Sequence, residues 1–224
     1  MRLKRLFDLA GAAGGLIVFL PAMTLIALAI VLDDGLPLFF RQERLGRRRR
    51  RFTILKFRSM RDGRVTRAGR VLRATGLDEL PQFINVLRGE MSAVGPRPLT
   101  AGDVARLGWS APRHDDRWRV PPGLTGLAQL VGSNTSRASL FLDRTYIARQ
   151  SVWLDIRMIA ASFAINALGK RRARALLIRR WRSSRVHLRT VSRNALPSRL
   201  AHHPHVGVAK CDCRRLPLPD ADHT

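Results

Sequence analysis

A long uncharged segment near the start of the chain constrains the fold more than any other feature. No charged residue occurs among the 24 residues from Leu9 to Leu32. As an α-helix rising about 1.5 Å per residue, the segment reaches roughly 36 Å, enough to cross the hydrocarbon core of a bilayer. A secretory signal peptide would have a shorter apolar region, followed by a cleavage site of small residues. The segment therefore predicts a membrane helix that is retained.

Two features of this segment bear on how the helix meets the membrane. Pro21 lies in its middle, where it removes a helical hydrogen bond and favours a kink or a break. Basic residues flank it on both sides, at Arg2, Lys4, Arg5, Arg41, Arg44 and Arg47 to Arg51. Because basic flanks prefer the cytoplasm, we expect a re-entrant helix that bends at Pro21 and returns, with a kinked span as the alternative. The denser second group predicts a cytoplasmic position for the rest of the chain in either case.

The strongly positive net charge of the chain indicates a polyanionic partner. Lys and Arg number 41 against 16 Asp and Glu, which gives a formal net charge of +25. Nucleic acid, anionic lipid and a phosphorylated substrate are the candidates. Because the chain has no recognisable nucleic-acid-binding motif and carries an apolar anchor, we expect no nucleic-acid partner. The run Arg47 to Arg51 is either a solvated turn or a turn resting on anionic membrane lipids, and its closeness to the anchor favours the lipids.

Patterns after the anchor predict a mostly helical α/β (α+β) module with one small β-hairpin. Leu36–Arg41 and Phe52–Phe57 are short apolar segments that we expect to pair as its strands. An amphipathic helix and its terminating glycine are predicted from Leu80, Phe83, Ile84, Leu87 and Gly89. Ala93–Leu99, with two prolines, is expected to be an extended loop, and Leu140–Ala167 to be largely helical.

The end of the chain differs in composition from the rest. Its last 55 residues hold 14 Lys and Arg and three Asp, with little apolar periodicity, which predicts a basic, mostly disordered tail. Potential zinc ligands occur there at His202, His203, His205, Cys211, Cys213 and His223. Their spacing fits no common zinc finger or ribbon, so we expect no zinc site. The predicted organisation is a membrane helix over 1–35, a folded domain over 36–168 and a tail over 169–224.

Asp78 and Glu79 are adjacent carboxylates at the predicted start of the amphipathic helix. Alone they have a structural interpretation, because Thr75 with Asp78 resembles a capping box and acids near a helix N-terminus contribute about 0.3–1 kcal/mol each. Four basic residues on flanking elements favour a chemical role instead: Lys56, Arg58, Arg73 and Arg97. Arginines beside a helix N-terminus suit a phosphate, and Arg97 stands between two prolines that restrict its backbone. Together these residues predict a phosphorylated, lipid-linked substrate.

This set of residues suits phosphoryl transfer. An ionised Asp78 can attack phosphorus and form an acyl phosphate, which divides a difficult displacement into two easier ones. Glu79 can take the proton of the second nucleophile or position it. Mg²⁺, held by the Asp78 carboxylate and by substrate oxygens, would neutralise a diphosphate. The arginines would stabilise charge on the equatorial oxygens.

Five segments carry a set of motifs in a fixed order. They are Lys4–Asp8 (KRLFD), Pro37–Gly46 (PLFFRQERLG), Phe52–Met60 (FTILKFRSM), Leu77–Pro98 (LDELPQFINVLRGEMSAVGPRP) and Pro122–Gly126 (PGLTG). One such motif is a weak signal, whereas five in order are highly specific. On these motifs the chain resembles, over about residues 2–165, the bacterial sugar transferase family, the monotopic phosphoglycosyl transferases.

The resemblance implies a compact α/β catalytic domain on a re-entrant helix broken at Pro21. It implies Mg²⁺-dependent transfer of a sugar 1-phosphate from a UDP-sugar to polyprenyl phosphate, through a covalent phosphosugar on Asp78, with Glu79 as its dyad partner. Arg73 and Arg97 match the phosphate-binding arginines of the family. The implied location is the cytoplasmic face of the bacterial inner membrane. Downstream glycosyltransferases would continue from the product in exopolysaccharide, O-antigen or glycan synthesis.

The chain departs from the family pattern at some positions. Leu20 precedes the proline where serine is common, and Gly76 also stands where serine is common. A non-catalytic membrane-associated scaffold of the same fold is the alternative function, and the intact Asp78–Glu79 pair argues against it. No motif decides which sugar is transferred.

Overall fold

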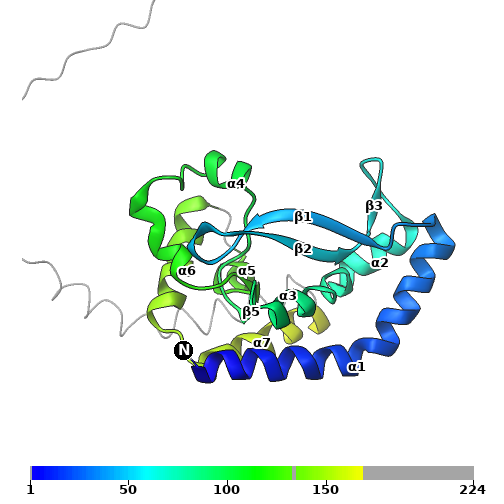
Figure 1. Cartoon of the computed structure of the whole chain (residues 1–224), viewed down its shortest axis with the longest axis horizontal. Coiled ribbons are helices and arrows are strands. Elements are labelled where there is room, and N and C mark those ends of the chain that lie inside the picture. Colours follow the sequence, from blue (N-terminus) through cyan, green and yellow to red (C-terminus); the bar gives the residue numbers. More distant parts are fainter. Residues whose placement is uncertain (1, 133–134, 169–224) are drawn as a thin grey trace, which may run out of the picture. The chain divides into compact units, whose positions relative to one another are not determined.

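The computed structural model describes residues 2–132 and 135–168, so the predicted tail and its histidines and cysteines lie outside the described residues. The elements in order are α1 (Arg2–Asp34), β1 (Phe39–Leu45), the 3₁₀ turn η1 (Arg47–Arg49), β2 (Arg51–Phe57), β3 (Met60–Arg61), β4 (Arg64–Val65), α2 (Arg67–Thr75), η2 (Leu77–Glu79), α3 (Gln82–Arg88), β5 (Ser92–Val94), α4 (Ala101–Arg106), η3 (Pro112–Arg119), β6 (Gly123–Thr125), α5 (Leu127–Val131), α6 (Ser136–Ala148) and α7 (Val152–Leu168). The mostly helical, mixed α/β character is as predicted (Figure 1).

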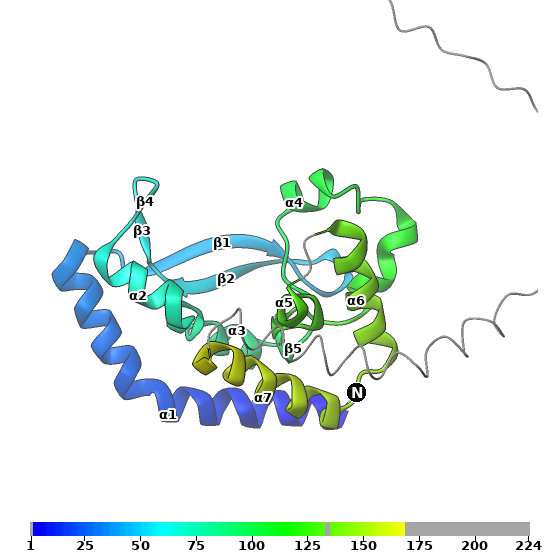
Figure 2. The same cartoon turned by 180° about the vertical axis from the view of Figure 1, so that it is seen from behind.

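The predicted membrane helix is present as α1, 33 residues long. Its most apolar window has a mean hydropathy of 2.7 and is only 11% buried, so its length and composition suit a membrane. The helix bends part-way along its length (Figures 1 and 2), and Pro21 lies inside it. The bend has the cause predicted for it, because proline lacks the amide that would complete the helical hydrogen bond. Helix α1 is nevertheless continuous, so Pro21 kinks the helix without ending it.

Strands β1 and β2 form the predicted antiparallel hairpin, with Phe39 opposite Phe57 and Leu45 opposite Arg51. The first strand begins later than the predicted Leu36–Arg41 and continues further. Pro37 has no amide to donate to a strand ladder, whereas the polar residues that follow it can pair. The arginine turn between the strands contains left-handed backbone at Arg48 and Arg49, with φ of 56° and 59°.

The prediction of a purely extended loop over Ala93–Leu99 is wrong at its start. Strand β5 pairs in parallel with β6, which lies about 30 residues further along the chain. A side chain at Gly123 would place Cβ 2.0 Å from the amide nitrogen of Gly95, so only glycine permits this approach of the two backbones. The local sequence pattern does not predict this pair of strands, because each strand has only three residues.

The segment predicted as largely helical, Leu140–Ala167, contains two helices, α6 and α7. The break between them has a local cause in Ser151. Its hydroxyl accepts from the amide of Leu154 at 3.2 Å, as a helix N-cap does, and so starts α7 afresh. Helix α7 lies along the first half of α1 (Figure 2).

Helix α3, predicted from its apolar spacing, ends at Gly89 as expected, with φ of 81°. Its buried Val86 joins Phe52 and Ile54 of β2 and Ala12 of α1 in one hydrophobic cluster. The buried Asn85 adds polar contacts to the same junction. Its Oδ1 accepts from the amide of Leu55 at 3.1 Å, and its Nδ2 donates to the carbonyl of Thr53 at 2.7 Å. Helix α3 is therefore fixed to both the hairpin and the membrane helix.

Candidate active site

Asp78 and Glu79 lie on the 3₁₀ turn η2, between α2 and α3. The capping-box interpretation of Thr75 is wrong. Thr75 is the last residue of α2, and its hydroxyl donates back to the carbonyls of Val71 at 2.8 Å and Leu72 at 3.2 Å. Gly76 then reverses the chain with a left-handed φ of 78°. The two half-buried carboxylates therefore lie on the connection between two helices, and no described contact gives them a capping function.

One cavity of about 1040 Å³ brings the predicted site residues together. Its lining includes Lys56, Arg58, Arg73, Asp78, Glu79 and Arg97. Arg44 and Arg117 join them, so six basic side chains face three carboxylates there. Pockets of this size accept ligands larger than a single sugar, and the excess positive charge favours an anionic one.

The two carboxylates differ in their partners. Glu79 accepts from the Lys56 ammonium group at 2.6 Å. Asp78 has no ion-pair partner within 4.0 Å among residues 2–132 and 135–168. Burial raises the pKa of the Asp78 carboxyl above its ordinary value. Lys56 and Arg73 oppose this shift, and the charge of Glu79 adds to it. Asp78 is thus the carboxylate that remains available to a ligand.

The predicted phosphate-binding residues fall into two groups. Arg58 borders the cavity, but it is only 8% exposed. Its guanidinium donates to the carbonyls of Gly35 at 2.6 Å and Asp34 at 3.0 Å, and it pairs with the Asp34 carboxylate at 3.0 Å. Arg58 therefore holds the end of α1. The side chains of Arg73 and Arg97 are exposed to solvent at the cavity, which leaves them accessible to an anion.

A buried pair that sequence reasoning missed supports Arg97. Arg117 donates through Nε to the Asp143 carboxylate at 2.8 Å and through Nη2 to the carbonyl of Arg97 at 2.5 Å. Its guanidinium also lies 5.3 Å and 5.0 Å from the ring centres of Trp109 and Trp118. The available signal was Asp143, an acid on the apolar face of α6 between Leu140 and Tyr146, because a buried acid needs a cationic partner.

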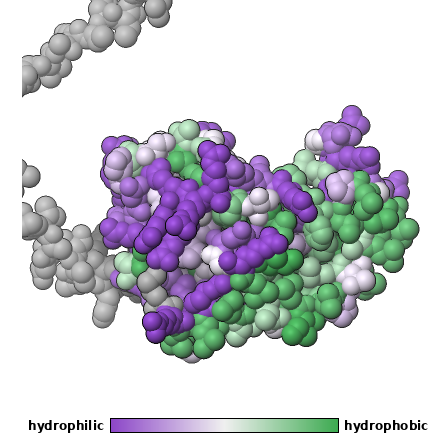
Figure 3. Space-filling model, in the orientation of Figure 1, coloured by the Kyte–Doolittle hydropathy of each residue, from purple (hydrophilic) through white to green (hydrophobic). Residues whose placement is uncertain are grey.

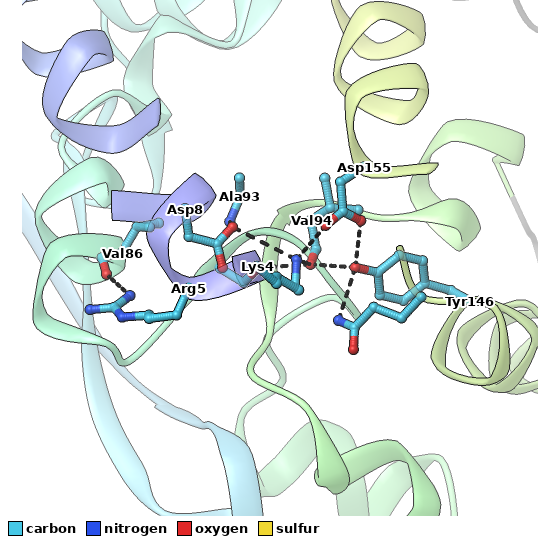
Figure 4. Close-up of polar contacts among 10 residues, drawn as sticks. Lys4, Arg5, Asp8, Val86, Ala93, Val94, Tyr146 and Asp155 are labelled. Atoms are coloured by element: carbon cyan, nitrogen blue, oxygen red, sulfur yellow. Dashed lines mark hydrogen bonds and ion pairs between the residues drawn. The ribbon is translucent and has the colours of Figure 1, made fainter. Parts of the chain in front are cut away.

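The first turns of α1 hold the segments that carry this site (Figure 4). Lys4 donates to the fully buried Asp155 at 2.6 Å and to the carbonyl of Val94 at 3.3 Å. Asp8 accepts from the amide of Ala93 at 3.1 Å. The hydroxyl of Tyr146 lies 2.9 Å from the Val94 carbonyl and 2.8 Å from Asp155. Strand β5, which leads directly into Arg97, is therefore fixed from α1, α6 and α7.

A second contact from the same turn reaches α3. Arg5 donates to the carbonyls of Val86 at 2.6 Å and Leu87 at 2.9 Å, in the last turn of α3 (Figure 4). The polar start of α1 thus binds both α3, which follows the Asp78–Glu79 turn, and β5, which precedes Arg97. In the sequence, Lys4 and Arg5 were interpreted as topological charges and as part of the KRLFD motif, and their contacts with α3 and β5 were not predicted.

The donor atoms at the cavity fit a magnesium ion that is shared with a substrate. The described residues contain no group of three or more His, Cys, Asp or Glu that would hold a metal by themselves. Mg²⁺ is usually bound by one or two carboxylates together with phosphate oxygens and water. Asp78, which is not ion-paired within the described part of the chain, supplies such a carboxylate beside side chains suited to phosphate.

Residues 1–168 match the family described as bacterial sugar transferase. The chain is 42% identical over 181 residues to the undecaprenyl-phosphate glucose phosphotransferase of Komagataeibacter xylinus, covering 70% of this chain and 34% of the relative. It is 40% identical over 177 residues to the UDP-glucose:undecaprenyl-phosphate glucose-1-phosphate transferase of Caulobacter vibrioides, covering 70% and 66%. It is 37% identical over 184 residues to the exopolysaccharide production protein PSS of Rhizobium leguminosarum bv. phaseoli, covering 70% and 91%.

The chain thus spans between one third and two thirds of the length of the first two relatives. The match includes the whole described part of the chain, from the membrane helix through α7. The chain belongs to the bacterial sugar transferase family.

Proposed function

We propose that the protein transfers a sugar 1-phosphate from a UDP-sugar to polyprenyl phosphate, and releases UMP. The observation that carries the proposal is the cavity in which the available Asp78 carboxylate lies beside the Lys56–Glu79 pair, Arg73 and Arg97. Two relatives have names that specify undecaprenyl phosphate, and one of these names specifies UDP-glucose. Their names support the two substrate classes, while the sugar used by this chain is left to experiment.

The proposed chemistry has two displacements at one phosphorus atom. A carboxylate oxygen of Asp78 attacks the phosphorus that carries the sugar, and the bond from this phosphorus to the oxygen bridging to UMP breaks. A phosphate oxygen of the polyprenyl phosphate then attacks the same phosphorus. The bond to Asp78 breaks, so the carboxylate is restored and a polyprenyl diphosphate sugar leaves. Each step forms one P–O bond and breaks one.

The other side chains have roles that follow from their contacts. Lys56 holds Glu79 in place at 2.6 Å, and Glu79 in turn is positioned to accept a proton from the acceptor phosphate if it arrives protonated. Arg73 and Arg97 bind phosphate oxygens and stabilise the charge that accumulates on them. Bound Mg²⁺, with Asp78 as its protein ligand, would neutralise the diphosphate of the donor.

We also propose that α1 is a re-entrant helix at the cytoplasmic face of the bacterial inner membrane. Both ends of α1 bind the same folded domain, Lys4 to Asp155 at its start and Asp34 to Arg58 at its end. This supports placing both ends on one side of the bilayer, near anionic lipids and downstream glycosyltransferases. Labelling of a cysteine introduced at Arg2 by a membrane-impermeant reagent in intact cells would contradict this topology.

The decisive experiment is release of UMP by the purified full chain in nanodiscs with polyprenyl phosphate, Mg²⁺ and a panel of UDP-sugars. We expect release with at least one donor, loss of release in Asp78→Asn, and full activity in Asp62→Asn. Asp62 is a matched control, because it undergoes the same chemical change on an exposed turn outside the cavity. Folded, membrane-bound protein that releases no UMP with any donor would instead support the scaffold alternative.

A further inference from the structure

Alternate residues of β1 line the cavity. Phe40, Gln42 and Arg44 face it, whereas their neighbours Phe39 and Arg41 do not, as the twofold side-chain period of a strand requires. Phe40 is paired across the hairpin with Lys56, the residue that binds Glu79. A large aromatic side chain thus lies next to the cationic part of the site, and it is 44% exposed.

Met60 is a second apolar side chain that lies beside a cation of the site, in this case Arg73. Met60 lines the same cavity, is 40% exposed, and accepts a contact from Arg73 Nη1 through its sulfur at 2.8 Å. Phe40 and Met60 each adjoin a cation that the proposed function assigns to the reacting groups. We call these two residues the apolar rim. Single exposed apolar residues are common, but two at the mouth of a strongly charged cavity indicate a ligand with an apolar part.

The apolar rim lies at the end of the hairpin that is joined to the membrane helix. Arg58 and Arg61, which directly flank this part of the chain, bind Asp34 at the end of α1. Leu36, between α1 and β1, is 70% exposed. Figure 3 shows hydrophobic surface extending over α1 towards this end of the domain, next to the hydrophilic surface of the catalytic part. A substrate entering from the membrane would therefore meet the rim beside the charged cavity.

We infer that Phe40 and Met60 bind the first isoprene units of the polyprenyl phosphate acceptor, which places its phosphate among Lys56, Arg73 and Asp78. This inference rests on the proposed function and assigns a position to one of its two substrates. In the acceptor, a hydrocarbon chain is joined directly to a phosphate. The hydrocarbon matches the apolar rim, and the phosphate matches the cations beside it. A UDP-sugar carries no hydrocarbon chain, so the rim contributes to acceptor binding and leaves donor binding unchanged.

Steady-state kinetics of Phe40→Ser and Met60→Ser test the inference. We expect the KM for polyprenyl phosphate to rise at least about fivefold in each variant, because apolar area that the chain covers is removed. The KM for the UDP-sugar and the burst of UMP released without acceptor should stay as in the wild type. Val65→Ser is the control for Met60, because Val65 is 39% exposed, pairs with Met60, and does not line the cavity. Phe141→Ser is the control for Phe40, because Phe141 is 59% exposed and does not line the cavity.

Equal increases in the variants and their controls, or a change in donor KM alone, would overturn the inference. A second measurement does not depend on turnover. A photoreactive isoprenyl phosphate should label the peptides that contain Phe40 or Met60 in nanodiscs, and polyprenyl phosphate should compete with it more strongly than phosphatidylglycerol does. Equal competition by the two lipids would identify the rim as a general membrane contact and refute the inference. If the wild type shows this labelling but releases no UMP, the proposed reaction fails while the lipid site stands.

Discussion

Removal of the Tyr146 hydroxyl is expected to weaken the link between α1 and the site measurably. Tyr146 is 1% exposed, and Tyr146→Phe keeps the ring and therefore opens almost no cavity. Burial and the charge of Asp155 raise the pKa of Tyr146, so the hydroxyl stays protonated and donates. It has one proton, and the charged Asp155 at 2.8 Å is the stronger of its two acceptors. Loss of a hydrogen bond to a charged group costs about 1.5–3 kcal/mol.

For a domain of this size, such a loss lowers the melting temperature by about 3–12 °C. Thermal unfolding in nanodiscs, followed by tryptophan fluorescence, measures the change. Thr145→Val is the matched control, because it removes a neighbouring hydroxyl whose one hydrogen bond among residues 2–132 and 135–168 stays within its own helix, to the carbonyl of Phe141. A melting temperature for Tyr146→Phe within about 1 °C of this control would refute the assigned role of the hydroxyl.

Three further predictions test the candidate site. Arg117→Lys keeps a charge beside Asp143, but an ammonium group cannot bond both Asp143 and the Arg97 carbonyl in the fixed planar geometry of a guanidinium group. The KM for the UDP-sugar donor should therefore rise about tenfold in UMP-release assays. The control Arg113→Lys should leave this KM unchanged. Because burial raises the pKa of Asp78 and attack requires its ionised form, the acceptor-independent burst should decline on acidification at a higher pH than an ordinary aspartate would give, as stopped-flow assays at stepped pH can show. Chelation of divalent cations should abolish UMP release, and added Mg²⁺ should restore it.

The parts of the fold that could be predicted have strong local patterns. The uncharged run gives α1, helical spacing gives α3, and two apolar segments give the hairpin. The adjacency of Lys56 and Glu79 goes beyond these patterns, because it depends on how β2 lies against η2. The buried Asn85 fixes that arrangement by bonding the backbone of β2 from α3. A polar residue in an apolar helix face gave no indication of which strand it would bind.

The contact of Arg117 with the Arg97 carbonyl could not be predicted from the sequence for a different reason. Arg117 is one of many arginines in a chain with 41 Lys and Arg, so its type carries little information. Its role comes from burial between two tryptophans and from a partner, Asp143, that lies 26 residues away. The family motif identified Arg97 itself, whereas the pair that fixes its backbone became visible only in three dimensions.

The polar start of α1 changes how the charges around the membrane helix should be interpreted. Lys4 was first counted among the basic flanks that prefer the cytoplasm, yet its side chain is only 14% exposed and pairs with a fully buried Asp155. An arrangement that placed the two ends of α1 on opposite sides of a bilayer would have to break this pair or the one between Arg58 and Asp34. Leaving a buried charge without its partner costs about 3–5 kcal/mol. The same contacts that position β5 and Arg97 therefore favour the bent, re-entrant helix over a span.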